Sequence, residues 1–302
     1  MNIILGQAYS FLQLGLRDNQ EDARWPESDS PDTGQRFFVV CDGVGGCEKG
    51  EEASATVCHA FAEALGDFDF TCDFTNADFS HALNKAYDAL DKKARLGQED
   101  MATTLTFAAF HAEGATLVHI GDSRIYQIRP SQGIVYRSDD HSLVNQMVHS
   151  GIITPEEAET HPQRNVITRC MEPVSEDQTR CMATVMRTNN VKAGDYFLLC
   201  TDGVLHQMSD AQLVELIVQD VSDEQKIQEL ARKTENSSDN NTAYLIPVLA
   251  VEGISTEIHP MSNTSSDTHR MTSSQSIEEI ESIPASEKDG VLTRFFKIFT
   301  GK

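Results

Sequence analysis

Acidic side chains at the ends of predicted strands are the residues of this sequence best placed to do chemistry. The apolar runs FFVVCDGVGG and YFLLCTDGV each end in an Asp-Gly pair, which contains Asp42 in the first and Asp202 in the second. Asp122 follows another apolar run in GDSR, and Asp239 precedes a strand in SDNNTA. Because a sheet fixes its strand ends while their loops open to solvent, a fold can gather such groups into one rigid site.

A single Asp-Gly pair is usually a turn, since Asp tolerates turn conformations and Gly supplies positive φ. Taken together, however, these pairs favour a site, because clustered carboxylates repel and a bound cation is the usual compensation. Hard oxygen ligands at the strand ends favour Mg²⁺ or Mn²⁺ over Zn²⁺, because the motif cysteines, Cys41 and Cys200, lie inside the strand patterns as small hydrophobic residues. The glycines after Asp42 would let the backbone approach closely and offer a carbonyl as a further oxygen ligand.

Arg17 stands a few residues before the acidic pair Glu21-Asp22 in GLRDNQEDA. Its guanidinium could present a fork of donors to a phosphate, or it could form a surface ion pair of little energetic value. Two cations about 3.5–4 Å apart could share a bridging carboxylate and activate a water. A metal-activated water, an arginine and a phosphate ester together predict phosphomonoester hydrolysis.

The composition excludes some classes of function. The chain has 302 residues and a formal net charge of -23, from 24 Lys and Arg against 47 Asp and Glu. Such a chain has no basic surface to neutralise phosphates, so we expect no nucleic-acid partner. Hydrophobic residues make up 39% of the chain, which suffices for the core of one large domain or two small ones.

The cysteines and the N-terminus predict a reducing, cytoplasmic location. The seven cysteines are scattered and form no C-x-x-C pair, so neither a zinc site nor a disulfide framework is predicted. The opening MNIILGQAYSF lacks the basic start and long apolar run of a secretory signal. No stretch reaches the roughly 18 apolar residues of a membrane span.

The elements that must position these acids are strands and helices in alternating groups. Residues 1–50 are predicted as strand, loop and strand, and helical spacing predicts helices over 51–65 and 76–95. Three β-branched and aromatic runs at 102–111, 115–128 and 133–140 are joined by short turns. Short turns indicate antiparallel pairing, because parallel strands need a long crossover.

The second half repeats the pattern of strand followed by helices. Helix starts are predicted at Thr154, where Pro follows, and at Ser209 and Ser222, each with Gln three residues on. The last predicted strand covers 242–251, and its Pro247 suggests an edge position or a bulge. Strands clustered between pairs of helices predict an α+β fold with helices covering antiparallel sheets.

The composition changes after the last predicted strand. Residues 1–251 are predicted as one folded domain, and 252–289 as a disordered Ser/Thr/Glu-rich linker. Residues 290–302, GVLTRFFKIFTGK, form a short amphipathic basic segment. Such a segment could dock on a membrane surface or a partner protein, or it could be a short helix folding back or a frayed end.

Eight segments, in order, resemble the metal-dependent Ser/Thr protein phosphatases of type 2C (the PPM family) in their bacterial form. They are GLRDNQEDA, VVCDGVGG, TTLTFAAF, HIGDSRIYQI, DHSLVNQMVHSGIITPEEA, HPQRNVITR, GDYFLLCTDGV and SDNNTA, within about Gly6 to Val251. The resemblance implies that 1–251 is a phosphatase catalytic domain with a four-layer α-β-β-α sandwich of two antiparallel sheets flanked by helices. It implies hydrolysis of phosphoserine and phosphothreonine in proteins by a water activated by two metal ions, Mn²⁺ or Mg²⁺.

The resemblance also assigns roles to single residues. Asp42 would bridge the two metals and Gly43 would contribute its carbonyl oxygen. Asp202 and Asp239 would complete the first metal site, while Glu21 would lie near the second, through water.

Further roles implied by the resemblance surround these ligands. Asp22 would be a supporting carboxylate behind the ligands, and Asp122 would help to hold a third, weaker metal. Arg17 would bind the substrate phosphate, and residues 148–165 would form a flap beside the site. Phosphoprotein substrates, an opposing Ser/Thr kinase as partner and a monomeric chain are expected on the same basis.

One departure from the family pattern concerns the proton donor. Val44 stands where several eukaryotic members carry a histidine proposed as general acid, so no donor to the leaving group is assigned. We interpret His141 and His161 as structural, because each adjoins a helix start or a turn. An inactive phosphoprotein-binding scaffold would be expected to lack a metal carboxylate, and none is missing; a small-molecule phosphatase stays open.

Overall fold

Two antiparallel sheets form the centre of the fold and bring the acidic strand ends into reach of one another. The five-stranded sheet has the order β3 (Ala23–Trp25), β4 (Phe37–Cys41), β5 (Leu105–His111), β6 (Gly114–Ile120), β9 (Thr184–Thr188). The six-stranded sheet has the order β1 (Asn2–Leu5), β11 (Asn241–Glu252), β10 (Tyr196–Cys200), β7 (Arg124–Arg129), β8 (Gly133–Arg137), and β2 (Tyr9–Gln13) also pairs with β11. Every pairing between these named strands is antiparallel, as predicted.

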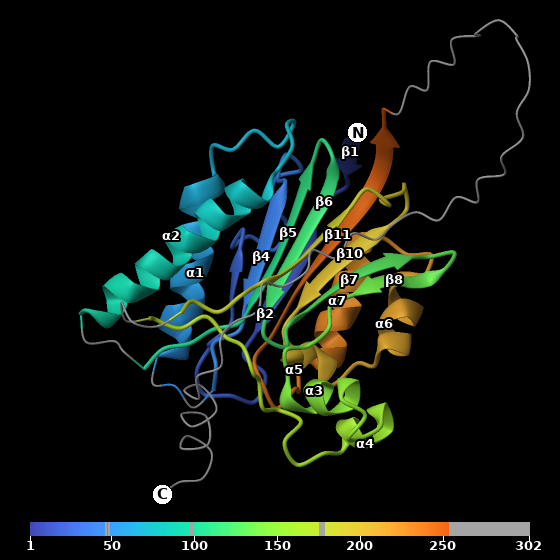
Figure 1. Cartoon of the computed structure of the whole chain (residues 1–302). Coiled ribbons are helices and arrows are strands. Elements are labelled where there is room, and N and C mark those ends of the chain that lie inside the picture. The colour runs from blue at the N-terminus through green and yellow to red at the C-terminus, as the bar shows by residue number, and fades with distance from the viewer. Residues whose placement is uncertain (46, 48, 97–99, 175–178, 254–302) are drawn as a thin grey trace, which may run out of the picture. The chain divides into compact units, whose positions relative to one another are not determined.

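Helices cover the outer faces of both sheets, so the predicted four-layer sandwich is confirmed (Figure 1). The helices α1 (Gly50–Leu65) and α2 (Asn76–Ala94) pack together on the five-stranded sheet. On the far side, α6 (Asp210–Ile217) and α7 (Asp223–Thr234) cover the six-stranded sheet. Three shorter helices complete the fold: α3 (Leu143–His149), α4 (Pro155–Glu159) and α5 (Asp202–Leu205).

The four layers enclose three buried cores, and successive side chains along each strand point into alternate cores. On β4, Phe38 and Val40 belong to the core between the sheets, whereas Phe37 and Val39 belong to the core under α1 and α2. On β10, Leu198 contributes to the third core, between the six-stranded sheet and its helices. Both faces of β4 and β10 are covered, which explains why their runs, FFVVC and YFLLC, are almost wholly apolar.

The helix starts follow the local signals in the sequence. Capping boxes occur at Thr75, Thr154, Ser209 and Ser222, where the cap side chain and the side chain three residues on each accept a backbone N–H. The last three were predicted, and all three are confirmed. Each box satisfies backbone donors that the first turn of a helix leaves unpaired.

Residues 1–50 contain the four strands β1 to β4, where strand, loop and strand were predicted, and three further features differ from the predicted elements. The run 115–128 is divided between β6 and β7, which lie in different sheets, and Gly121 makes the turn with φ +102°. Pro247 is not at an edge, because β11 pairs on both sides, but the pairing with β1 is irregular next to it, as a bulge would be. β9 was not predicted.

The computed structural model describes residues 1–45, 47, 49–96, 100–174 and 179–253. One compact unit runs from Met1 to Glu252, and the chain divides from it at Gly253. The predicted linker and the amphipathic segment 290–302 therefore lie almost wholly outside the described residues and stay predictions. None of the described helices combines the length and the apolar character that crossing a membrane requires.

Candidate metal centre

Four segments far apart in the sequence bring the predicted acidic residues together. Asp42 directly follows β4, Asp202 is the first residue of α5 just after β10, and Asp239 lies in the loop before β11. Asp122 lies in the turn between β6 and β7. Burial raises the pKa of Asp42 well above its usual value, and the charges of Asp22, Asp202, Asp122 and Asp239 raise it further. The predicted cluster is therefore present in the fold.

Asp42 and Asp202 are the central pair of this cluster. Their carboxyl groups are close enough for one, when protonated, to hydrogen-bond the other. Burial raises the pKa of Asp202, and His206 partly opposes that rise. The Oδ1 atom of Asp202 is buried and has no hydrogen-bond partner among the described residues. A buried carboxylate oxygen without a partner is costly, so this position requires a compensating cation or proton.

Asp22 links the segment that carries Asp202 to the segment that carries Asp239 through two side-chain hydrogen bonds. Its Oδ2 accepts hydrogen bonds from the hydroxyls of Thr201, at 3.0 Å, and Thr242, at 2.7 Å. Thr201 immediately precedes Asp202, and Thr242 follows Asp239 by three residues. Burial raises the pKa of Asp22 to about 7, although both threonine hydrogen bonds favour its charged form. The location agrees with a supporting carboxylate, and the role itself stays a prediction.

Gly43 lies where no other residue would fit. Its N–H donates to the Glu21 carbonyl at 3.0 Å. A Cβ at Gly43 would lie 2.6 Å from the Gly50 carbonyl carbon and oxygen and 2.8 Å from the Glu21 carbonyl oxygen. The glycine therefore permits three backbone segments to meet beside Asp42.

Glu21 is placed at the rim of the cluster by its own backbone. Its N–H donates to the Asn240 side chain at 2.8 Å, which links it to the residue after Asp239. Burial raises the pKa of the Glu21 carboxyl, Arg17 lowers it, and the charges of Glu51 and Asp239 add to the rise. Glu21 is thus near the predicted ligands and feels their charge.

Arg17 reaches the cluster through Asp239. Its Nη2 donates to Asp239 Oδ2 at 2.7 Å and its Nε donates to the Ser238 carbonyl at 3.2 Å. The side chain is 45% exposed, so the guanidinium lies at the solvent side of the site. The predicted alternative of an ion pair is therefore present, and its partner is itself a predicted metal ligand.

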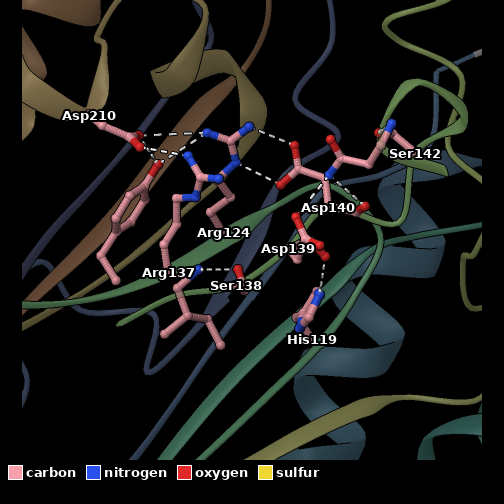
Figure 2. A network of polar contacts seen from close by, with 11 residues as sticks. His119, Arg124, Arg137, Ser138, Asp139, Asp140, Ser142 and Asp210 are labelled. Atoms are coloured by element: carbon pink, nitrogen blue, oxygen red, sulfur yellow. Dashed lines mark hydrogen bonds and ion pairs between the residues drawn. The ribbon is translucent and has the colours of Figure 1, made fainter. Parts of the chain in front are cut away.

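Arg124, two residues after Asp122, belongs to a polar network that the sequence did not reveal (Figure 2). Arg124 donates from Nε and Nη2 to the two carboxylate oxygens of Asp140, at 2.6 and 2.7 Å. Asp210 at the start of α6 accepts from Arg137 at 2.7 Å and from Tyr126 at 2.9 Å. Burial raises the pKa of Asp122 well above its usual value, and the charges of Asp202 and Asp140 raise it further.

The histidines that were interpreted as structural have structural contacts. His141 Nδ1 accepts from the Gly121 N–H at 3.1 Å, and its Nε2 lies 2.8 Å from the Thr184 hydroxyl. The ring stacks on His119, with centroids 4.4 Å apart. Burial, followed by the charges of His119 and Arg169, lowers the pKa of His141 to about 3, so the ring is neutral. His161 Nδ1 accepts from a backbone N–H in a turn.

His206 is the residue that sequence reasoning missed. It lies four residues after Asp202, and its Nε2 is 3.5 Å from Asp202 Oδ2. Asp202, His206 and Asp239 each offer one ligand atom, and these atoms all lie within 4.8 Å of one another. The spacing D-x-x-x-H across a helix start was the available signal, but the histidine lies just outside the quoted motif.

The donor set fits a hard divalent cation. Its members are carboxylates, a glycine that allows close backbone approach, and one imidazole, with no cysteine among them. Such oxygen-rich sites suit Mg²⁺ and Mn²⁺. The buried, unpartnered oxygens of Asp202 and Asp22 are the observation that most directly calls for a cation.

Comparisons with known proteins agree with this chemistry. A family model described as protein phosphatase 2C matches residues 20–244. The protein phosphatase PhpP of Streptococcus pneumoniae is 32% identical over 220 residues, which is 70% of this chain and 86% of that protein.

Solved structures with the same fold include two of a named phosphatase. The serine/threonine phosphatase PstP/Ppp of Mycobacterium tuberculosis has a TM-score of 0.67 and 29% identity, covering 81% of this chain and 99% of that one. The catalytic domain of serine/threonine protein phosphatase PstP in complex with two manganese ions has a TM-score of 0.64 and 28% identity, covering 82% and 100%.

Proposed function

The chain belongs to the protein phosphatase 2C family, and from that premise we propose that it hydrolyses phosphoserine and phosphothreonine in proteins with two divalent cations, Mn²⁺ or Mg²⁺. The observation that carries the proposal is the convergence of Asp42, Asp202 and Asp239, from three distant segments, around a buried oxygen without a partner. Three ionised carboxylates gathered in this way would destabilise the fold if no cation compensated their charge.

The proposed ligands follow from the positions of the side chains. Asp42, whose pKa is raised by burial and by the charges of the other acids, is proposed as the bridge between two cations, with Asp202 and Asp239 on one of them. The Gly43 carbonyl and Glu21 would complete the set. When bound, the cations supply a water nucleophile at neutral pH and neutralise charge on the phosphate.

Asp22 and Asp122 have supporting places in the proposal. Asp22 holds the hydroxyls of Thr201 and Thr242 and so fixes the backbone on either side of the ligands. Asp122, in the turn beside Asp202, is proposed as a ligand of a third, weaker cation.

Arg17 is proposed to bind the substrate phosphate. Its place at the solvent side of the cluster is where a phosphate would approach. Guanidinium groups bind phosphate oxygens through two parallel hydrogen bonds, which fixes orientation as well as affinity. No histidine occupies position 44, and Val44 offers no proton to the leaving oxygen.

The substrate would be a phosphoprotein, and the partner enzyme a Ser/Thr kinase whose products this chain reverses. That partner, a monomeric state, a cytoplasmic location and docking through residues 290–302 are all proposals that rest on the sequence.

Phosphate release from p-nitrophenyl phosphate and from a phosphothreonine peptide tests the proposal, with Mn²⁺ and with chelator. We expect turnover of both that chelator abolishes. A hydrogen bond to a charged group contributes about 1.5–3 kcal/mol, so Arg17→Ala should lower kcat/KM about 10- to 100-fold.

The matched control is Arg232→Ala, which removes an exposed arginine paired with Glu229 on α7. That variant should keep the rates of the unaltered chain. Absence of metal-dependent turnover of either substrate would refute the proposed function.

A further inference from the structure

His206 lies among the proposed ligands, although neither the sequence motifs nor the comparisons give it a role. Its Nε2 is 3.5 Å from Asp202 Oδ2, and the imidazole is 30% exposed. Its ligand atom and those of Asp202 and Asp239 lie within 4.8 Å of one another. The side chain therefore faces the carboxylates rather than bulk solvent alone.

The backbone fixes His206 relative to both aspartates. The His206 N–H donates to the Asp202 carbonyl at 2.8 Å, which closes the single turn of α5 and puts both side chains on one face. The Ser237 hydroxyl donates to the Gly203 carbonyl at 2.8 Å and joins this turn to the loop that carries Asp239. A Cβ at Gly203 would collide with the Asn240 carbonyl oxygen, so the two segments are in direct contact.

The separations suit shared ligation better than a hydrogen bond. Two ligands at right angles, each about 2.1 Å from a cation, are about 3.0 Å apart, and opposite ligands are about 4.2 Å apart. The observed 3.5 Å between His206 Nε2 and Asp202 Oδ2 lies within that span. It is long for an N–H···O hydrogen bond, whose usual limit is about 3.2 Å.

We propose that His206 is a nitrogen ligand, through Nε2, of the cation held by Asp202 and Asp239. The inference rests on the proposed function, since it concerns the same metal centre. It gives an otherwise all-oxygen site one imidazole, and imidazole favours transition metals over Mg²⁺. The centre would consequently prefer Mn²⁺ to Mg²⁺ more strongly than carboxylates alone would make it.

Pulsed electron paramagnetic resonance of bound Mn²⁺ tests this directly. The full chain, labelled with ¹⁵N-histidine and freed of metal by chelator, is loaded with Mn²⁺, and the electron spin echo modulation is recorded. We expect a histidine ¹⁵N coupling of directly bound imidazole in the unaltered chain and its loss in His206→Gln. His59→Gln is the matched control and should keep the coupling, because His59 is an exposed histidine on α1 that pairs with Glu27.

Calorimetric titration of Mn²⁺ and Mg²⁺ adds a second readout. Loss of a ligand should weaken Mn²⁺ binding by His206→Gln at least about tenfold, since even partners of ligands contribute about that much. An unaltered chain that binds Mn²⁺ without a histidine coupling, or an unchanged Mn²⁺ affinity in His206→Gln, would overturn the inference and leave the proposed function standing. Failure of the unaltered chain to bind Mn²⁺ at all would overturn both.

Discussion

Replacing Asp202 by Asn should have opposite consequences with and without cations. In the metal-free protein, burial raises the pKa of Asp202 above its ordinary value, and the charge of Asp239 adds to the rise. An acid whose pKa is higher in the folded state than the roughly 3.9 of the unfolded chain loses stability as pH rises through that interval. At pH 7.5 its charge is therefore unfavourable, and Asp202→Asn should be at least as stable as the unaltered chain in chelator.

In the presence of the cation we expect the unaltered chain to be more stable than Asp202→Asn. A cation at 100 times its dissociation constant stabilises the folded state by about 2.7 kcal/mol per site. For a domain of this size 1 kcal/mol shifts Tm by roughly 2–4 °C, so one site should raise Tm by about 5–11 °C. Asp202→Asn removes a ligand and the charge that attracts the cation, and we expect its shift at the same Mn²⁺ concentration to be less than half as large.

Differential scanning calorimetry at pH 7.5, in chelator and across a Mn²⁺ titration, measures both effects. Asp220→Asn, which removes an exposed carboxylate, serves as control and should follow the unaltered chain in both conditions. If Asp202→Asn unfolds at a clearly lower temperature in chelator and gains as much from Mn²⁺ as the unaltered chain, then Asp202 is not in the metal site and its charge is not unfavourable.

Two other features have consequences that urea unfolding can measure. In Gly203→Ala the new Cβ would collide with the Asn240 carbonyl oxygen, so the free energy of unfolding should fall by about 1–3 kcal/mol. In the control Gly34→Ala the nearest atom to the new Cβ would be 3.4 Å away, so the free energy of unfolding should change little. Equal losses in the two variants would contradict the packing argument. Burial, and then the charge of His119, lowers the pKa of His141 to about 3 in the folded chain, whereas an unfolded histidine titrates near pH 6.5. The contribution of the neutral His141 ring to folding stability is therefore fully present above about pH 6.5 and is lost as the pH falls towards 3. His141→Gln should show a flatter fall of the urea midpoint between pH 7.5 and 5 than the unaltered chain, and an equal slope would refute this.

Local patterns in the sequence were sufficient to predict most of the helices and strands. The helix predicted at 51–65 is Gly50–Leu65, and the helix starts at Ser209 and Ser222 were recognisable from side chains three residues apart. The division of 115–128 was not recognisable, because the strand continues in β-forming residues on both sides of Gly121. Only packing of the second half against the other sheet makes the turn necessary.

The cluster of acidic residues was predictable to the extent that each proposed ligand lies next to the end of a strand. Asp42 and Asp202 follow apolar runs, and the resemblance supplied the roles that spacing could not. What spacing could not reveal were contacts across the fold, such as the Arg124–Asp140 pair over 16 residues or the Asp22–Thr242 hydrogen bond over 220. Those partners have no sequence pattern that links them, since the sheets bring them together only after folding.

The proposed roles of Arg17 and Asp239 would connect metal binding to substrate binding. In the structure the Nε and Nη2 of Arg17 are engaged by the Ser238 carbonyl and Asp239. A phosphate approaching this arginine would therefore meet the charge of the Asp239 carboxylate, which repels it. A cation on Asp239 would remove that repulsion and weaken the hold of the carboxylate on the guanidinium. Phosphate affinity should consequently depend on prior occupation of the centre, because in this proposal one aspartate serves both the cation and the arginine.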